Sequence, residues 1–305
     1  MPSRSHNLDV KYGLTVPNFG EAFDVRTLAQ MAREAEAVGW DGFFVWDHVQ
    51  FMPIPTVDPW IALAAIALST ERVRIGTMVT PVPRRRPVKL ARETVTLDHL
   101  SHGRLILGVG IGLGPWEWDY FGEETNLVRR AAMLDEALNL LTRLWTGEPV
   151  LFNGQFYRYR GDFGPGQPAV NPTPMLPAAL QQPRIPIWVA GTWPTKPPFR
   201  RAARWDGVVP LGPNRGRGPR MLPADVREML EYIRPYRESH EPFDVVIGGE
   251  TRGPDDLATV QPYIQAGATW WLEDLSPWAF GWTGEGPWPV AAIRERVRNG
   301  PPRTA

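Results

Sequence analysis

The sequence contains no cysteine, only three lysines among its 305 residues, and no excess of charge of either sign. Without cysteine the chain has no disulfide, no thiolate metal ligand and no cysteine nucleophile. Because 33 basic residues balance 33 acidic ones, the composition gives no electrostatic case for binding nucleic acid. A metal site is not expected either, since neither a His-x-His nor a His-Glu-x-x-His spacing occurs.

Long apolar runs are missing too. No window approaches the roughly 18 apolar residues of a membrane-spanning helix. Residues 1–9 form a short polar N-terminal tail that lacks the apolar core of a signal peptide. The apolar and charged fractions, 43% and 22%, are those of an ordinary globular protein. We therefore expect a cytoplasmic enzyme that acts on a small molecule, with neither nucleic acid nor membrane as a partner.

The chain does have a regular alternation of short apolar runs and helix-length segments. The apolar runs scarcely alternate in polarity, which is typical of parallel strands buried on both faces. Eight strand–helix pairs favour an α/β fold of the closed (β/α)8 TIM-barrel type over an open doubly wound sheet. The predicted strands are residues 10–16, 42–46, 73–79, 105–109, 187–190, 207–209, 245–247 and 269–272. The predicted helices are residues 24–38, 58–69, 87–100, 127–145, 199–204, 223–238, 254–266 and 289–298.

Residues 10–305 are expected to form one barrel domain with an insertion at 147–186, between the fourth and fifth strands. The insertion opens with a hairpin-like run, residues 149–159, that would turn at Asn153-Gly154. A proline-rich stretch follows. Because loops of this length are commonly functional, we interpret the insertion as a cover over the barrel mouth.

Catalytic side chains of such barrels follow the C-terminal ends of the strands, and His48 is the best candidate there. Its imidazole could hold or release a proton beside a redox ring near neutral pH. A histidine bonded to a loop carbonyl is the alternative. Asp47 could orient His48 or bond a cofactor edge, or it could be a turn former. His99 and His102 precede the fourth strand, so we expect structural roles for them at the opposite end.

Basic and aromatic residues in the same loops indicate ligand walls. Arg84–Arg86 could meet an anionic cofactor tail or lie in a solvated loop. The turn Ala190–Trp193 could hold a phosphate or be only a tight connection. Loop aromatics predict an apolar substrate wall, with a barrel cap or a subunit contact as alternatives. The expected wall residues are Phe19, Trp116, Trp193, Trp278 and Trp282, and Trp288 lies in the same loop as the last two.

Three stretches carry a family pattern: Gly39–His48, Val73–Pro81, and Leu97-Asp98-x-Leu100-Ser101-x-Gly103-Arg104-x-x-Leu107-Gly108-Val109-Gly110-x-Gly112. In these stretches the sequence resembles the luciferase-like monooxygenase superfamily, including its deazaflavin-dependent branch. The resemblance implies a (β/α)8 barrel with an insertion over the mouth and FMN or coenzyme F420 bound there. It also implies a homodimer and a non-proline cis peptide at Thr77–Met78.

Within the family, the Asp47-His48 pair resembles the deazaflavin branch, since FMN monooxygenases more often carry Glu-His. The branch's sugar-phosphate dehydrogenases have a glutamate just after the fourth-strand glycines. Leu113 and Gly114 stand there in this chain, and Glu117 follows only later, so we do not expect that activity.

We expect F420-dependent hydride transfer to or from a small organic substrate, with His48 moving the proton. An FMN-dependent monooxygenase that uses reduced flavin and oxygen is the first alternative. A hydrolase built on Glu250, Glu273 and Asp274 and a flavin-binding protein without turnover are the others. The residues expected to bind the cofactor are Asn18, Asp47, Thr77, Met78, Thr80, Gly110, Gly112, Ala190, Gly191, Thr192 and Leu211.

Overall fold

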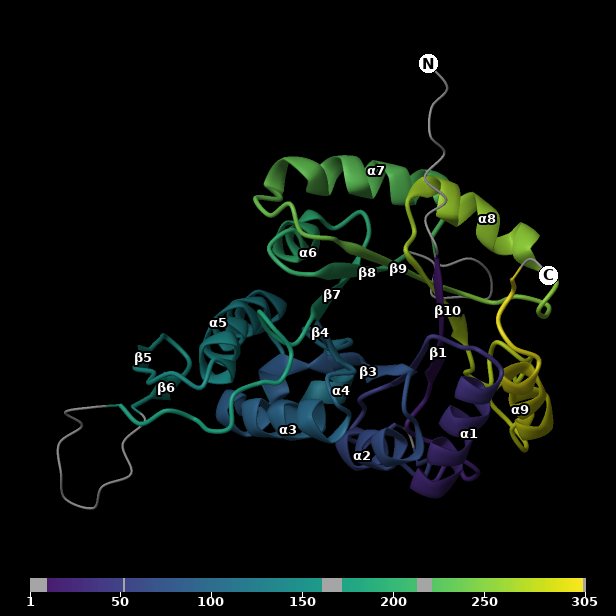
Figure 1. Cartoon of the computed structure of the whole chain (residues 1–305), viewed down its shortest axis with the longest axis horizontal. Coiled ribbons are helices and arrows are strands. Elements are labelled where there is room, and N and C mark those ends of the chain that lie inside the picture. Colours follow the sequence, from purple (N-terminus) through teal and green to yellow (C-terminus); the bar gives the residue numbers. More distant parts are fainter. Residues whose placement is uncertain (1–9, 52, 161–171, 213–220, 304–305) are drawn as a thin grey trace.

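Eight parallel strands close into a barrel in the computed structural model, which describes residues 10–51, 53–160, 172–212 and 221–303 (Figure 1). Neighbouring strands follow the order β1-β10-β9-β8-β7-β4-β3-β2, so the predicted closed (β/α)8 barrel is confirmed. The strands are β1 (Lys11–Val16), β2 (Gly42–Val45), β3 (Arg74–Pro81), β4 (Leu105–Gly110), β7 (Ile187–Thr192), β8 (Gly207–Leu211), β9 (Asp244–Gly249) and β10 (Trp270–Asp274).

Helices surround the barrel on all sides (Figure 1). Asp24, Asp58 and Asn126 cap α1, α2 and α5 by accepting backbone N–H groups. Helix α4 was not predicted from the sequence, and α6 begins three residues before the predicted start at 199. The helices are α1 (Val25–Ala37), α2 (Pro59–Ser69), α3 (Pro87–Leu100), α4 (Pro115–Asp119), α5 (Leu127–Trp145), α6 (Lys196–Ala202), α7 (Pro223–Ile233), α8 (Leu257–Ala266) and α9 (Val290–Arg298). None of these helices is long and apolar enough to span a membrane.

The barrel interior is packed with side chains. Three of them are aromatic: Trp188 lies 5.2 Å from both Phe44 and Trp270, measured between ring centroids. Ile106, Val209, Val246 and Leu272 complete this inner cluster. The interior is therefore closed to ligands, and a ligand site has to lie above it, at the C-terminal strand ends.

A bulge in β3 shapes one side of that end. Thr77 still pairs with Leu107, but Thr80 pairs with Val109, so three steps along β3 match two along β4. The non-proline cis peptide joins Met78 to Val79, and the expected position, Thr77–Met78, is wrong by one residue. Thr77 remains in register with β4, so the irregularity begins only after it.

The described parts of the insertion contact α5 and the N-terminal side of β4. Strands β5 (Phe152–Asn153) and β6 (Arg158–Tyr159) form the predicted hairpin, but its turn is longer than Asn153-Gly154, because the Glu136 carboxylate accepts three N–H groups of residues 155–157. Asp98, just before β4, accepts the N–H groups of Leu180 and Gln181. The described part of the insertion thus does not cover the mouth. A connection from a helix to the next strand has to start at the N-terminal end of the strands. Residues 161–171, which were also expected over the mouth, lie outside the described residues.

Candidate active site

Asn18 joins the loops that follow β1 and β2. Its side chain is fully buried, and its Oδ1 accepts the His48 N–H at 3.1 Å. Its Nδ2 donates to the carbonyls of His48 and Val57, each at 2.8 Å. The amide therefore bonds backbone groups of both loops and positions His48. Its expected contact with a cofactor stays a prediction.

Asp47 fastens the end of β2 to the β3 bulge. The Thr80 hydroxyl donates to its Oδ2 at 2.7 Å, and the Arg85 guanidinium donates to its Oδ1. Thr77 Oγ1 lies 2.9 Å from Thr80 Oγ1 and donates to the Gly108 carbonyl. Burial raises the pKa of Asp47, although Arg85 and Thr80 act in the opposite direction. Three of the predicted cofactor residues thus form one network under the mouth.

Glu117 is the partner of His48, and sequence reasoning had set it aside. His48 Nδ1 lies 3.1 Å from Glu117 Oε1, and Arg84 donates to the same oxygen at 3.1 Å. Burial alone would raise the pKa of Glu117, but the bonds and charges of His48 and Arg84 outweigh it and hold that pKa below its ordinary value. Because Nδ1 is engaged by a carboxylate, Nε2 is the ring nitrogen that can exchange a proton with a ligand.

Helix α4 explains why the glutamate stands later in the sequence than the family pattern suggests. Gly112 has a φ of +80°, and a Cβ there would lie 2.4 Å from the Trp118 ring. The chain therefore turns at Gly112 and enters α4, which carries Glu117 back to His48. Pro115 after Gly114, with a glutamate in the first turn, was the sequence signal for this helix.

Two arginines and a tryptophan lie beside this group with unused donors. The guanidinium carbons of Arg84 and Arg130 lie 4.5 Å and 4.2 Å from the Trp118 ring centroid. Arg84 Nη2, Arg130 Nε and Nη1, and Trp118 Nε1 are all buried without a hydrogen-bond partner among the described residues. Unpaired buried donors cost about 1–3 kcal/mol each, so this group, which we call the Arg84–Trp118–Arg130 cluster, fits an anionic ligand group. Arg84 and Arg85 are both ion-paired, which argues against the solvated-loop interpretation.

Residues of the turn after β7 pack against α6. A Cβ on Gly191 would lie 2.3 Å from Pro198, so this glycine lets α6 approach the strand. Trp193 is buried against Phe199, with Lys196 Nζ 3.7 Å from its ring centroid. It therefore belongs to the helix layer and is not among the aromatic rings near His48.

Other predicted residues do lie at the mouth. Met78 and Ala190 pack on top of the inner cluster. Leu211 and Thr192 pair at the ends of β8 and β7, and a Cβ on Gly110 would lie 3.0 Å from Val79. Trp116 is in α4, but its side chain lies outside the described part of the chain.

Aromatic rings from three loops border His48. Phe19 stacks on Phe51, with ring centroids 4.3 Å apart and planes 10° apart. The His48 ring lies 5.7 Å from Phe19 and 5.0 Å from Phe51. Trp278 lies 6.0 Å from Phe51, so the predicted wall reaches the catalytic candidate. We call Phe19, Trp46, Phe51, Trp278, Trp282 and Trp288 the aromatic wall.

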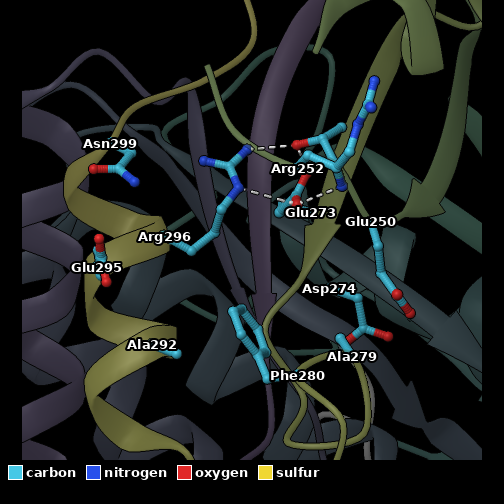
Figure 2. A pocket seen from close by; sticks show the side chains of 11 residues that line it. Glu250, Arg252, Glu273, Asp274, Ala279, Phe280, Ala292, Glu295, Arg296 and Asn299 are labelled. Atoms are coloured by element: carbon cyan, nitrogen blue, oxygen red, sulfur yellow. Dashed lines mark hydrogen bonds and ion pairs between the residues drawn. The ribbon is translucent and has the colours of Figure 1, made fainter. Parts of the chain in front are cut away.

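A cavity of about 280 Å³ lies between α9 and the ends of β9 and β10 (Figure 2). Glu273 accepts bonds there from Arg296 and from Thr251, so it is committed to a structural ion pair. Glu250 follows β9, and Asp274 is the last residue of β10 (Figure 2). Within the described ranges, no group of His, Asp and Glu is suited to a metal ion. The three carboxylates expected for a hydrolase, Glu250, Glu273 and Asp274, all line this cavity, and Glu273 is held there by Arg296.

This arrangement is that of a barrel enzyme whose ligands lie over the strand ends. Comparison with known protein families gives a narrower assignment. The family model described as luciferase-like monooxygenase matches residues 8–255 of this chain. The chain belongs to the luciferase-like monooxygenase family.

Relatives and structural neighbours include F420- and FMN-dependent enzymes. An uncharacterised protein of Mycobacterium tuberculosis (strain H37Rv) is 29% identical over 76% of this chain and 90% of its own length. An F420-dependent glucose-6-phosphate dehydrogenase of Amycolatopsis mediterranei is 40% identical, but over only 45% of this chain and 43% of its own length.

Among solved structures, the coenzyme F420-dependent tetrahydromethanopterin reductase of Methanopyrus kandleri has a TM-score of 0.69 at 16% identity, covering 96% of this chain and 98% of its own. A type II Baeyer-Villiger monooxygenase of Pseudomonas putida, in complex with FMN, has a TM-score of 0.59 at 18% identity, covering 84% and 75%. These two likenesses show the shared fold. The family makes the chain an oxidoreductase of the flavin or deazaflavin type.

Proposed function

We propose that the protein transfers hydride between coenzyme F420 and a small organic substrate. The observation that carries the proposal is the His48–Glu117 pair at the mouth, in which Glu117 is buried and His48 is partly buried, with Asp47 adjacent in sequence. An F420-dependent oxidoreductase needs a group that gives or takes one proton for each hydride. A histidine whose ring is held by a carboxylate is suited to that task.

When bound, the deazaflavin supplies or accepts the hydride, and the protein's residues do the rest. Met78, Ala190 and Leu211 offer an apolar floor above the inner cluster. The Arg84–Trp118–Arg130 cluster provides the unpaired donors for the cofactor's phosphate. His48 Nε2 holds or releases the substrate proton, while Glu117 and Asn18 fix the position of its ring.

An FMN-dependent monooxygenase is the second candidate, because the same donors fit the phosphate of FMN. Parallel titration of the purified apoprotein with F420 and FMN, followed by tryptophan quenching, separates the two. Micromolar or tighter binding of F420 alone supports the proposal. Binding of FMN together with substrate-dependent oxygen consumption supports the alternative, and binding of neither contradicts both.

A further inference from the structure

We propose that an anion bound at the Arg84–Trp118–Arg130 cluster fixes the loop of residues 113–123, which includes α4, and so secures the contact between Glu117 and His48. Arg84 is then a positioning residue, because it acts on His48 only through Glu117. We call residues 113–123 the α4 loop. The proposal rests on the proposed function for the identity of the anion, which is the cofactor's phosphate. The binding of inorganic sulfate tests it without the cofactor.

Few side chains anchor the α4 loop to the barrel. Its helix has five residues, a length at which a helix has no stability of its own in water. Glycines with positive φ stand just before the loop and near its end, Gly112 at +80° and Gly122 at +64°. Residues 119–122 are exposed, whereas Glu117 and Trp118 are buried. The position of the loop therefore depends on the partners of these two buried side chains.

Arg84, in the 3₁₀ turn that follows β3, contacts four side chains of the α4 loop. Its Nη1 donates to Glu117 Oε1 at 3.1 Å, and its Nε donates to Glu123 Oε2 at 2.7 Å. Its guanidinium carbon lies 4.5 Å from the ring centroid of Trp118 and 5.6 Å from that of Phe121. The remaining nitrogen, Nη2, is buried and has no hydrogen-bond partner in the described part of the chain. One arginine thus holds the loop and keeps a donor for a ligand.

Arg130 of α5 contacts the beginning of the loop. Its side chain is fully buried, and its Nη2 donates to the Leu113 carbonyl at 3.1 Å. Burial lowers the pKa of this guanidinium and the charge of Arg84 lowers it too, although three nearby glutamates act in the opposite direction. Its Nε and Nη1 are unpaired within the described ranges. Because a buried charge is costly unless it is paired, an anion beside the two arginines stabilises both.

Shared atoms connect this anion site to His48. The unpaired donors belong to Arg84, Trp118 and Arg130, which contact one another, so an oxyanion with several acceptor oxygens can bond both arginines and the loop itself. Arg84 Nη1 and His48 Nδ1 both lie 3.1 Å from Glu117 Oε1. An anion that restricts the Arg84 guanidinium therefore also restricts the carboxylate that orients His48. By thermodynamic reciprocity, the Glu117–His48 contact in turn favours binding of the anion.

Hydrogen exchange with and without sulfate tests whether the anion fixes the loop. The amides of Phe121, Gly122 and Glu123 donate to carbonyls inside the loop, so their exchange measures its opening. With sulfate at about ten times its Kd, these amides should exchange about tenfold more slowly, the factor expected for a ligand that binds only the closed loop. Sodium chloride at the same ionic strength is the reference, because salts also act on whole proteins.

Nuclear magnetic resonance of the histidine rings tests whether the anion reaches His48. Sulfate should shift the ring nitrogen signals of His48, which are identified by their loss in His48→Asn. The signals of His99 should stay unchanged, because that ring bonds the insertion at the opposite end of the barrel. Arg130→Met should remove the exchange and resonance responses, whereas Arg129→Met should keep both, since Arg129 is exposed and paired with Glu124.

Arg84→Lys separates anion binding from its effect on His48. Lysine keeps the positive charge but has a single nitrogen, which cannot bond Glu117, Glu123 and the anion in the geometry of the guanidinium. We expect sulfate to bind this variant with a Kd within about tenfold of the wild-type value, as the loss of one hydrogen bond allows. The His48 signals should no longer respond. A wild-type response would show that Arg84 is not the link.

The remaining outcomes also decide the proposal. No binding of sulfate, binding that changes neither measurement, or a wild-type response in Arg130→Met overturns it. If circular dichroism shows that Arg130→Met fails to fold, Trp118→Phe takes its place, because it removes the indole donor and keeps a ring. A separate titration with F420 distinguishes the two proposals. The sulfate responses without F420 binding contradict the proposed function and leave the coupling standing, and F420 binding without the sulfate responses does the reverse.

Discussion

Individual side chains at the barrel mouth have different roles. His48 is the only histidine there among the described residues, and its backbone is held by Asn18 while its ring is held by Glu117. Asp47 has a different role, because both of its oxygens face inward to Thr80 and Arg85. We therefore regard His48 as the proton carrier and Asp47 as a positioning residue.

Replacing His48 by asparagine should lower the rate of hydride transfer by about 10²–10⁴-fold, the usual worth of a general acid or base. The measurement is the rate at which substrate oxidises the reduced cofactor under single-turnover conditions. His99→Asn is the matched control, because His99 bonds the Ala178 carbonyl at the opposite end of the barrel. Equal rates for the two variants would remove His48 from the mechanism.

Replacing Glu117 by glutamine should change the pH dependence of stability. A carboxyl group whose pKa is lower in the folded protein stabilises it above the ordinary glutamate pKa of about 4.3, and this contribution is lost as the pH falls through the folded value. Because Glu117 is buried and bonds Arg84 and His48, we expect Glu117→Gln to cost about 3 kcal/mol at neutral pH.

Urea unfolding between pH 3 and pH 7 provides the measurement for Glu117. The difference in free energy of unfolding between wild type and Glu117→Gln should be constant near neutral pH and should shrink below about pH 4.3. The exposed Glu148→Gln is the control. A difference that stays constant down to pH 3 would show that the ion pair does not set the stability of this loop.

Helices α4 and α5 together build the proposed phosphate site. The ring of Trp118, in α4, contacts the guanidinium groups of Arg84, which follows β3, and of Arg130, which is in α5. Arg130→Met should raise the Kd for the cofactor roughly 10–100-fold, as expected for lost hydrogen bonds to a charged group. The ligand-free variant should remain folded, since the substitution also removes two unpaired donors.

Arg129→Met is a matched control for Arg130→Met, because Arg129 is the adjacent residue but its side chain is exposed and paired with Glu124. Thermal unfolding with and without the cofactor measures both effects. If the two variants lose cofactor stabilisation equally, the assignment of the Arg84–Trp118–Arg130 cluster to the phosphate is wrong.

Helix α2 exposes large apolar side chains on its outer side. Its sequence is apolar on every side, and Ile61 and Leu68 remain 62% and 74% exposed. A helix that is apolar all round is normally covered, and we propose that a second copy of the chain covers it, in keeping with the expected homodimer. Ile61→Asp with Leu68→Asp should halve the mass found by light scattering. Val128→Asp, on the exposed side of α5, should not change it, and an unchanged mass for the α2 variant would contradict the assignment.

The two ends of the barrel have different roles in the molecule. Loops that follow strands bring together His48, Glu117 and the aromatic wall. On the N-terminal side of the strands, Asp98 of α3 accepts hydrogen bonds from Leu180 and Gln181 of the insertion. The family pattern around residues 97–104 therefore serves structure, and the pattern around residues 39–48 ends at the site.

The barrel could be predicted because it depends on local and periodic features. Buried parallel strands need continuous apolar runs, and helices need caps such as Asp24 and Asp58, so their positions are visible along the chain. The family, the candidate His48 and the wall residues Phe19, Trp278 and Trp282 also followed from motifs and from the rule of strand ends.

Contacts between residues that are far apart in the sequence could not be predicted in this way. Glu117 reaches His48 from 69 positions away because Gly112 turns the chain into a short helix. Gly191 lets α6 pack close to β7, and Trp193 packs on Phe199 of α6, which no local pattern indicated. Leu180 and Gln181 of the insertion bond Asp98 near the N-terminal end of β4. The cis peptide follows Met78 because register with β4 is kept through Thr77.

The sequence alone thus determined the barrel, the family and the residues that follow each strand, because periodicity, capping and motifs act over short distances. Only the tertiary structure decided which of those residues meet: the His48–Glu117 pair, the Arg84–Trp118–Arg130 cluster and the continuous aromatic wall. Hydrogen bonds, ion pairs and ring contacts between loops depend on where the closed barrel places each strand end. That placement is a property of all eight strands together.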